Sequence, residues 1–476
     1  MTESRRRCSA SGRNMKAVRT INKEVAGSMR VGVIAVMLML SLLIGVAGVV
    51  AQDAPRRLSL DEAIHLGLDN SKALNASAMN VQYADAKASE INAGRLPSVK
   101  FSGSYTRLSD IEPFEITVPI PGLTPNTFVL SPTILNNYTY RASIAAPIFT
   151  GFKLENSVAA ADLAVEAAQA DLTKDRTEVV YAVKSAYWGL YKANEVKKVV
   201  DENVALMEAH LKDAQNLVDQ GLLATNDLLK IEVQLSNTKL LQIDANNAVR
   251  VAQVNLNNLL GLPLPTQTEI TTGIRHDPRT FGGWSSLVDT AVGERADLQA
   301  MELRVKAGEA SVSAARGAWW PQISVFGDYL SARPNPRVVP AQDIYKDTWD
   351  FGIQVSLDVW NWGIAAHQTA QAEAQLAQAK DAQGSLRDAV ALEVTQNYLA
   401  LQQAKEKIGV ARQTIDQAEE NSRITGDKFK EGLALTTDVL DADVALLQAK
   451  TNYTQSLVDY ELAEGRLEKS LGEEAR

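Results

Sequence analysis

The side chains that could carry out chemistry are few and scattered. None of the histidines has the HExxH spacing of a zinc hydrolase; they are His65, His210, His276 and His367. The chain also lacks a glycine-rich phosphate loop and the GxSxG elbow of a serine hydrolase. Asp441 and Asp443 are close in sequence, but residues two apart on a helix point in different directions. We therefore predict no catalytic residue, no cofactor, no metal site and no enzyme activity.

A proline-free stretch from Phe152 to Leu262 dominates the chain. Its apolar residues recur three and four positions apart, which is typical of a coiled-coil helix. This apolar seam consists of Val158, Ala161, Val165, Ala168, Leu172, Val179, Val183, Ala186, Leu190, Ala193, Val200, Val204, Met207, Leu211, Ala214 and Val218. Gly221 interrupts the seam, so we predict a helix, a tight turn and a returning helix. The first helix would be on the order of 100 Å long.

The pattern returns 211 residues further along the chain. Matching pairs include Val183 and Val394, Tyr187 and Tyr398, Leu190 and Leu401, and the turns Gly221-Leu222 and Gly432-Leu433. A constant offset through a whole helical hairpin indicates duplication. We predict repeat 1 at 52–263, a linker at 264–285 and repeat 2 at 286–476.

The first 51 residues differ from the rest. A basic segment precedes the apolar run Val31 to Val50, and small residues end that run, so we predict a signal peptide at 1–51 cleaved after Ala51. The alternative is a retained anchor, because twenty apolar residues could span a bilayer. The single cysteine, Cys8, lies before the run. Residues 1–51 hold eight of the 48 Lys and Arg but two of the 57 Asp and Glu, so the remainder has a formal net charge of −15 and nucleic acid is not expected as a partner.

Four stretches alternate between apolar and polar residues, as strands do: 99–106, 138–149, 322–329 and 349–359. Helical segments at 58–94 and 298–318 precede the two pairs. Two connections, 107–137 and 330–348, hold eight of the fifteen prolines and are predicted to be loops. Each half of the chain is then helix, strand, loop, strand, long helix, turn and helix.

Strands of about ten residues with one apolar face are typical of an outer-membrane barrel. A soluble, half-buried sheet alternates in the same way and is the alternative. Five of the seven tryptophans bracket the second strand pair, as interfacial aromatic residues would; they are Trp319, Trp320, Trp349, Trp360 and Trp362. Four strands cannot close a barrel, and lipid does not tolerate open edges, so the chain must oligomerise. Three copies would supply twelve strands.

At this point the chain resembles the TolC family of outer-membrane efflux and secretion proteins. The resemblance covers residues 58–472 and depends on the duplicated plan, on Pro147-Ile148-Phe149-Thr150-Gly151, and on the segment from Gly432 to Ala442. It implies a mixed α and β membrane protein: a homotrimer with a 12-stranded β-barrel in the outer membrane, continued by an α-helical coiled-coil barrel into the periplasm. It also implies a passive duct of a tripartite efflux or type I secretion system, with a periplasmic adaptor protein and an inner-membrane transporter as partners.

The resemblance also assigns residues to the periplasmic entrance. Asp438 and Asp441 match an aspartate pair that rings the entrance in the family, and Asp227 matches an aspartate of the first hairpin. Each has an alternative role, because an acid in a first helical turn is favoured by the helix dipole alone. Ala434 stands where some members carry a basic residue that locks the entrance. Lys230 is the repeat counterpart of Asp441.

The turns match the family's adaptor-facing tips, formed here by Gly221, Leu222, Gly432 and Leu433. Their simpler explanation is a helix stop, with glycine in the left-handed conformation. At the start of the second long helix, Trp360-Asn361-Trp362-Gly363 replaces the family's small, glycine-rich turn, and we expect the bend to be retained. For the whole chain, the alternative function is a structural periplasmic coiled-coil protein without a pore.

Overall fold

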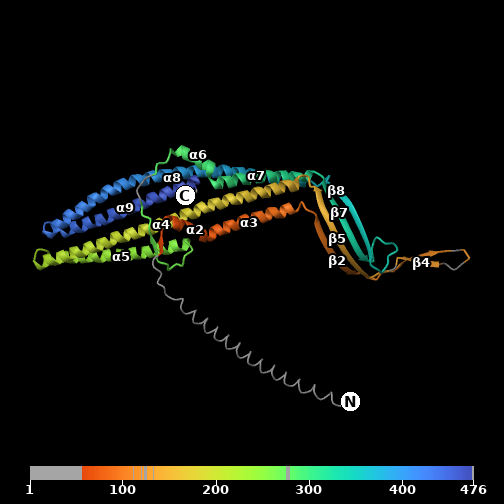
Figure 1. The fold of residues 1–476 in the computed structure, drawn as a ribbon, viewed down its shortest axis with the longest axis horizontal. Helices are drawn as coiled ribbons and strands as arrows, with labels where there is room; N and C mark the ends of the chain where they lie inside the picture. The colour runs from red at the N-terminus through yellow and green to blue at the C-terminus, as the bar shows by residue number, and fades with distance from the viewer. Residues whose placement is uncertain are drawn as a thin grey trace, which may run out of the picture. The chain divides into compact units, whose positions relative to one another are not determined.

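The chain is organised around four long helices and a four-stranded sheet (Figure 1). The computed structural model describes residues 56–110, 112–119, 121–122, 126–131, 133–274 and 279–473. In chain order the elements are β1 (Arg56–Leu58), α2 (Leu60–Asn70), α3 (Lys72–Ala93), β2 (Ser98–Arg107), β3 (Phe114–Val118), β4 (Asn126–Ser131), β5 (Asn136–Phe149), α4 (Lys153–Asp219), α5 (Thr225–Leu259), β6 (Thr268–Ile270), α6 (Trp284–Glu294), α7 (Ala296–Arg316), η1 (Gly317–Trp319), β7 (Gln322–Arg333), β8 (Lys346–Ser356), α8 (Ile364–Lys430) and α9 (Thr436–Leu471). The predicted signal peptide lies outside the described residues.

The predicted helical hairpins are present. Helices α4 and α8 each contain 67 residues, and they return as α5 and α9 with 35 and 36 residues. At 1.5 Å per residue the two longest helices extend about 100 Å. The seam residues named above on α4 are all buried or half-buried, as their spacing requires. Among the described residues, no helix combines the length and the apolarity needed to cross a membrane.

Both hairpin turns are made by the same helix-ending motif. Gly221 has φ +71° and its N–H donates to the Val218 carbonyl, while the Leu222 N–H donates to the Leu217 carbonyl at 2.9 Å. The second turn repeats this arrangement: Gly432 has φ +72°, and the Leu433 N–H donates to the Lys428 carbonyl at 2.8 Å. This pattern satisfies free carbonyls at the helix end and favours glycine at the positive φ. The predicted helix stops are therefore confirmed.

The sheet has the strand order β2-β5-β7-β8, with every neighbouring pair antiparallel. Strand β8 is as long as predicted but lies three residues earlier: it runs from Lys346 to Ser356 and leaves Leu357 and Val359 outside. Its last partner is Gln322, and the preceding Pro321 has no N–H with which to extend the ladder.

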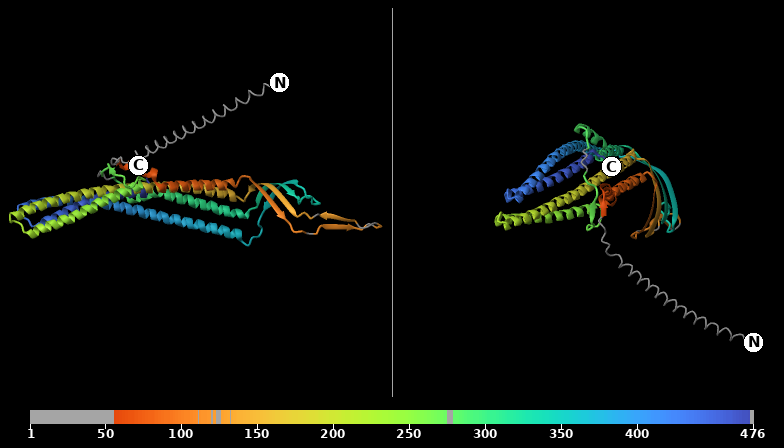
Figure 2. Two further views of the ribbon diagram at one scale, coloured as in Figure 1. Left: turned by 90° about the horizontal axis from the view of Figure 1, so that it is seen from below. Right: turned by 60° about the vertical axis from the view of Figure 1, so that its left-hand side comes forward.

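The prediction of an unstructured loop at 107–137 was wrong. Strands β3 and β4 pair there as a second antiparallel sheet, and this hairpin extends beyond the four-stranded sheet (Figures 1 and 2). The prolines Pro113 and Pro119 flank β3 and do not interrupt it, which is compatible with a strand. The second predicted loop is also shorter than 330–348, since β7 continues to Arg333 and β8 begins at Lys346.

The first helical region is divided. Ser71 ends α2 and caps α3, since its Oγ accepts the Leu74 N–H at 3.2 Å. The predicted linker at 264–285 contains β6, which pairs with β1. Tyr187 of α4 ties this small sheet to the helices: its hydroxyl donates to the Leu58 carbonyl at 3.1 Å and accepts the Thr272 N–H at 2.9 Å.

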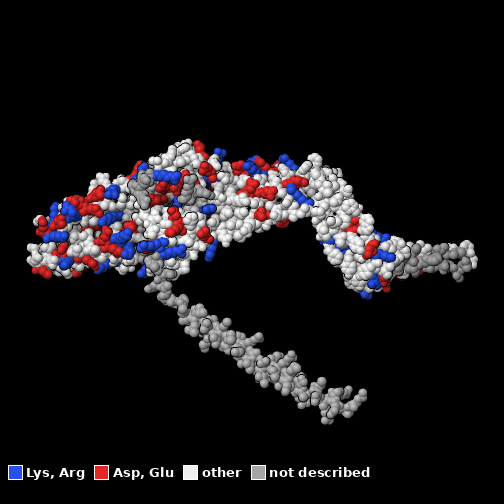
Figure 3. Space-filling model, in the orientation of Figure 1, with Lys and Arg blue, Asp and Glu red and all other residues white. Residues whose placement is uncertain are grey.

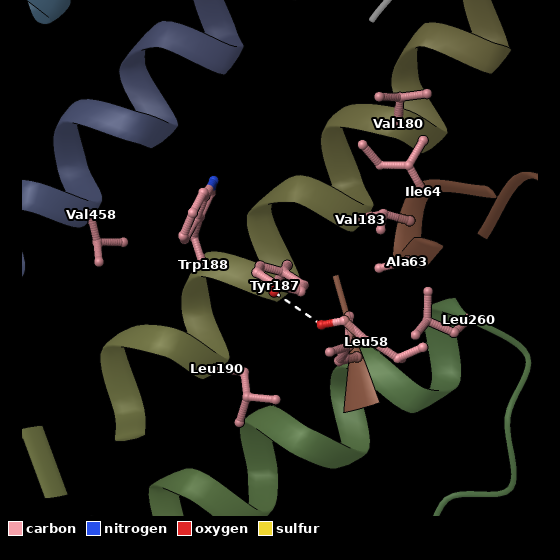
Figure 4. Close-up of a cluster of buried hydrophobic side chains, with 11 residues drawn as sticks. Leu58, Ala63, Ile64, Val180, Val183, Tyr187, Trp188, Leu190, Leu260 and Val458 are labelled. Carbon is pink, nitrogen blue, oxygen red and sulfur yellow. Dashed lines mark hydrogen bonds between the residues drawn. The ribbon is translucent and has the colours of Figure 1, made fainter. Parts of the chain in front are cut away.

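Two apolar cores hold the helices together midway along their length. The first surrounds Tyr187 and joins α2, α4, α5 and α9 (Figure 4); its buried residues are Leu58, Ala63, Ile64, Val180, Val183, Tyr187, Trp188, Leu190, Leu256, Leu260 and Val458. The second contains Val394 and Leu401 of α8, the predicted counterparts of Val183 and Leu190. Both members of each pair are almost fully buried.

The two junctions between sheet and long helix turn in the same way. Gly151 and Phe152 have φ +65° and +64° before α4, and Trp362 and Gly363 have φ +55° and +81° before α8. The order of glycine and aromatic residue is exchanged, but the backbone conformation is retained. The expectation that Trp360-Asn361-Trp362-Gly363 keeps the bend is thus confirmed.

Candidate functional site: the apolar sheet face and the hairpin ends

One face of the four-stranded sheet is apolar and exposed. The register aligns Val99 with Ile144, and Gly327 with Phe351, so the apolar residues of all four strands share one side. The exposed members include Val99, Phe101, Ile144, Phe351, Ile353 and Val355. The opposite face carries polar groups, such as Ser143, whose hydroxyl donates to Asp328. Charged residues are dense over the helices in Figure 3 and sparse over the sheet.

Aromatic side chains gather at both ends of this face. At the loop end the exposed rings are Tyr105, Tyr140, Tyr329, Tyr345 and Trp349, and at the helix end they are Phe152, Trp319, Trp320, Trp360 and Trp362. The helix-end rings contact one another, with Trp360 and Trp362 centroids 5.7 Å apart and Phe152 and Trp320 centroids 6.5 Å apart. An apolar band between two aromatic girdles is typical of an outer-membrane strand. A soluble sheet would instead pack this face against its own core, whereas among the described residues Tyr345 packs against its loop end and the strand residues named above stay exposed.

The predicted entrance residues lie at the hairpin ends and differ in their surroundings. Asp227 accepts a hydrogen bond from Lys230 at 2.8 Å, so its charge is paired within the helix. Asp438 is exposed and accepts the Leu435 N–H at 3.3 Å, which is the helix-end role left open by the sequence. Asp441 is exposed and makes no hydrogen bond or ion pair with any described residue. Of the three, Asp441 is the most available for a ligand.

The predicted tip residues lie at the outer ends of the turns. Leu222 and Leu433 are 68% and 73% exposed, which is high for leucine. Beneath them, the ends of both hairpins pack together through a cluster of buried residues: Ala214, Leu217, Ile231, Phe429 and Val439. The two tips are therefore held next to each other, and each carries a solvent-exposed leucine.

A buried polar contact between the hairpins was missed by the sequence analysis. His210 of α4 is 4% exposed and its Nε2 lies 3.1 Å from Oδ2 of Asp443 on α9, which is 2% exposed. The other oxygen of Asp443 accepts the Ser422 hydroxyl of α8 at 2.8 Å. The His210 and Asp443 atoms do not meet full hydrogen-bond geometry, and Nδ1 of His210 has no hydrogen-bond partner among the described residues. Phe429 packs edge-on against the imidazole.

The helical spacing itself contained the signal for this contact. The predicted seam ran through Leu211 and Val218, but the structure buries His210 and Leu217 more deeply. The spacing from Met207 to His210 is three, so it satisfies the coiled-coil pattern as well as Leu211 does. A polar residue at a core position of a coiled coil specifies which partner it meets. Here the contact of His210 with Asp443 specifies how the first hairpin packs on the second.

The acidic residues on α9 predict a pH dependence. Burial, with repulsion from Glu464 and Glu468, raises the pKa of Glu461 to about 7. The folded protein then binds a proton that the unfolded chain releases near pH 4.5, so stability is lost as pH rises from about 4.5 through 7. Glu461→Gln should therefore melt at nearly the same temperature as the parent at pH 4 and at a higher temperature at pH 8. Thermal unfolding at the two pH values checks this, with the exposed Glu431→Gln as control; a parallel shift at both would contradict it.

Comparison with known proteins agrees with this geometry. The family described as "Outer membrane efflux protein" matches residues 63–262 and 287–473. "Outer membrane efflux protein BepC" of Brucella suis biovar 1 is 23% identical over 400 residues, covering 82% of each chain. "Pyoverdine export outer membrane protein OpmQ" of Pseudomonas putida is 24% identical, covering 87% of this chain and 85% of that protein. The solved structure of the outer membrane protein VceC from Vibrio cholerae superimposes with a TM-score of 0.71 at 18% identity, covering 87% and 96% of the two chains.

The chain belongs to the outer membrane efflux protein family. The predicted family, the outer-membrane location with a periplasmic extension, and the role as outer-membrane component of efflux or secretion are confirmed. The mixed helix-and-strand fold agrees with the solved channels. The family consists of transport proteins and not of enzymes.

Proposed function

We propose that three copies of the chain assemble into one duct. The observation that carries this is the open four-stranded sheet with an exposed apolar face. Its outer strands β2 and β8 each have a neighbour on one side only within the described residues. Because lipid does not tolerate unpaired strand edges, β8 of one copy pairs with β2 of the next. Three copies give a 12-stranded barrel, and their α4, α5, α8 and α9 helices continue it as a helical barrel.

The duplicated plan supports the proposed domain limits. The two matched segments, 63–262 and 287–473, are separated close to the proposed linker at 264–285. Helices α4 and α8 have equal length, and both hairpins turn with the same glycine geometry. We assign repeat 1 to 52–263 and repeat 2 to 286–476.

The helical end of the duct is proposed to meet a periplasmic adaptor and, through it, an inner-membrane transporter. Gly221, Leu222, Gly432 and Leu433 form the tips that would contact the adaptor, and the exposed leucines supply apolar anchors. The duct conducts passively, and the transporter supplies the energy. Relatives named for pyoverdine export and for alkaline protease secretion share the family, so this plan does not by itself select a cargo.

Asp441 and Asp438 are proposed to ring the entrance of the duct, with Asp227 contributing less because Lys230 pairs with it. Three copies bring six exposed carboxylates from the first two positions around one axis. A constriction lined by carboxylates attracts cations and binds multivalent ones. The exposed Asp441 carries most of this effect.

The proposed function predicts a trimer that conducts ions. Protein purified in detergent should run as a trimer and form channels in a planar bilayer, and trivalent cations added from the hairpin side should block them. Asp438→Ala with Asp441→Ala should weaken that block, whereas Asp416→Ala, far from the turn on α8, should not. A monomer without conductance that fractionates away from the outer membrane would support the pore-free coiled-coil alternative. Unchanged block in the double variant would remove these aspartates from the entrance.

A further inference from the structure

The connection between β7 and β8 folds back over the polar face of the sheet. Asn335 is 1% exposed; its side-chain amide donates to the Lys346 carbonyl at 2.9 Å and to the Thr348 hydroxyl at 3.2 Å. Its amide oxygen accepts the Arg337 N–H at 2.9 Å. In β8, Thr348 alternates with the apolar Trp349, so it belongs to the polar face. The asparagine therefore anchors the start of the connection on that face.

A second contact fixes the same segment further along the sheet. The guanidinium of Arg337 forms an ion pair with Asp350, the next residue of β8 on the polar face. Leu330 and Ala332 of β7 lie on this face too and are almost fully buried, although the face is otherwise polar. A cavity of about 320 Å³ separates the segment from β5, and it is lined by Asn137, Thr139, Pro334, Asn335, Pro336, Val338, Val339, Pro340 and Ala341.

The returning part of the connection crosses to the other face. Arg333 and Asp343 form a two-pronged ion pair with separations of 2.8 and 3.1 Å. Tyr345 packs against Tyr138 and Tyr140 of the apolar face, with both ring centroids at 6.3 Å. The connection thus straddles the end of the sheet and is held on both sides. The β3–β4 hairpin of the other connection instead extends away from the sheet (Figure 2).

We propose that residues 334–341 narrow the outward opening of the duct and set the size of what leaves it. This inference rests on the proposed barrel, in which the polar face lines the lumen. Three copies then place three such segments inside the mouth, each held by Asn335 and by the ion pair of Arg337 with Asp350. Val339 of this segment is 89% exposed, so it is accessible to a reagent.

The test labels this segment from outside. In a Cys8→Ser background, Val339→Cys should react with a polyethylene glycol maleimide added on the loop side, and conductance should fall by about twofold or more, since pore diameter sets conduction. Ile116→Cys, which is exposed on the β3–β4 hairpin, is the matched control; it should react equally well and leave conductance nearly unchanged.

A second variant tests the anchor. Arg337→Glu places a like charge beside Asp350, so the segment should detach and larger polyethylene glycols should enter from the loop side. The control Arg107→Glu makes the same charge change on an exposed arginine of β2 at the same end of the sheet but outside this connection, and it should leave the polymer size limit unchanged. If the trimer conducts but neither labelling at Val339 nor Arg337→Glu alters conductance or polymer entry, the inference is wrong and the proposed duct stands. If no form of the trimer conducts, both proposals are overturned.

Discussion

Replacing His210 with alanine is expected to destabilise the hairpin ends by about 1–3 kcal/mol, because it removes a buried polar neighbour and leaves a buried polar group of the contact unsatisfied. The partner is Asp443, whose Oδ2 would lose the imidazole nitrogen 3.1 Å away while Oδ1 still accepts the Ser422 hydroxyl. His65→Ala is the matched control: His65 is exposed on α2, and surface changes usually stay within about 0.5 kcal/mol.

Hydrogen exchange of the amides around Met207 and Val439 is the sharpest measurement, since it reports local opening of the helix ends in the assembled protein. Faster exchange should be confined to the ends of α4, α5, α8 and α9 and be absent from the cores midway along the helices. The double variant His210→Leu with Asp443→Leu should recover most of the loss, because apolar residues of similar volume can replace a buried polar pair. Equal effects of His210→Ala and His65→Ala would show that the contact contributes nothing.

The same variant should affect the entrance. The contact joins the two hairpins at a point about two to three helical turns from their tips. Without this contact the two tips separate more readily. The single-channel conductance should therefore rise, and the channel should open more often. A variant that is destabilised but conducts like the parent would mean that the contact holds the helices without restraining the entrance.

Arginine at position 353 is expected to reduce assembly into the membrane, while arginine at the next position should not. Ile353 is 67% exposed on the apolar face of β8, and its neighbour Gln354 is exposed on the polar face. An arginine on the lipid side of a barrel strand costs about 2–4 kcal/mol near the bilayer midplane. On the lumen side it stays in contact with water, so the expected change is within about 0.5 kcal/mol.

The pair Ile353→Arg and Gln354→Arg changes the same strand by the same side chain, so strand propensity and added charge are matched. The measurements are the amount of protein in the outer-membrane fraction and the denaturant midpoint after refolding into lipid vesicles. If both variants assemble equally well, the apolar face does not contact lipid, and the sheet would have to be covered by protein.

Much of this fold could be predicted from local patterns. The spacing of Val183, Leu190 and their counterparts Val394 and Leu401 predicted two long helices, and all four residues are buried. Alternation along 99–106 and 138–149 predicted strands, and the register later placed their apolar residues on one side. The spacing of apolar residues along the sequence shows which side of a helix or strand is apolar, because side chains recur on one side every 3.6 residues in a helix and every two in a strand.

The errors arose where composition was used in place of pattern. Prolines led to the prediction of a loop at 107–137, but β3 lies between Pro113 and Pro119 and forms a hairpin with β4. For the same reason, the predicted strands stopped short of the loop ends of β7 and β8, which continue to Arg333 and begin at Lys346. Proline limits where a strand can begin and end, and it does not prevent one from forming beside it.

By itself the sequence determined the length of the helices, the glycine turns, the apolar side of each strand and the family to which the chain belongs. Only the tertiary structure decided that His210 meets Asp443 and that the β7–β8 connection folds onto the polar face. The physical reason is the range of the interactions. Periodicity is set by neighbours within a few residues, whereas these contacts join segments brought together only when the hairpins pack and the strands align.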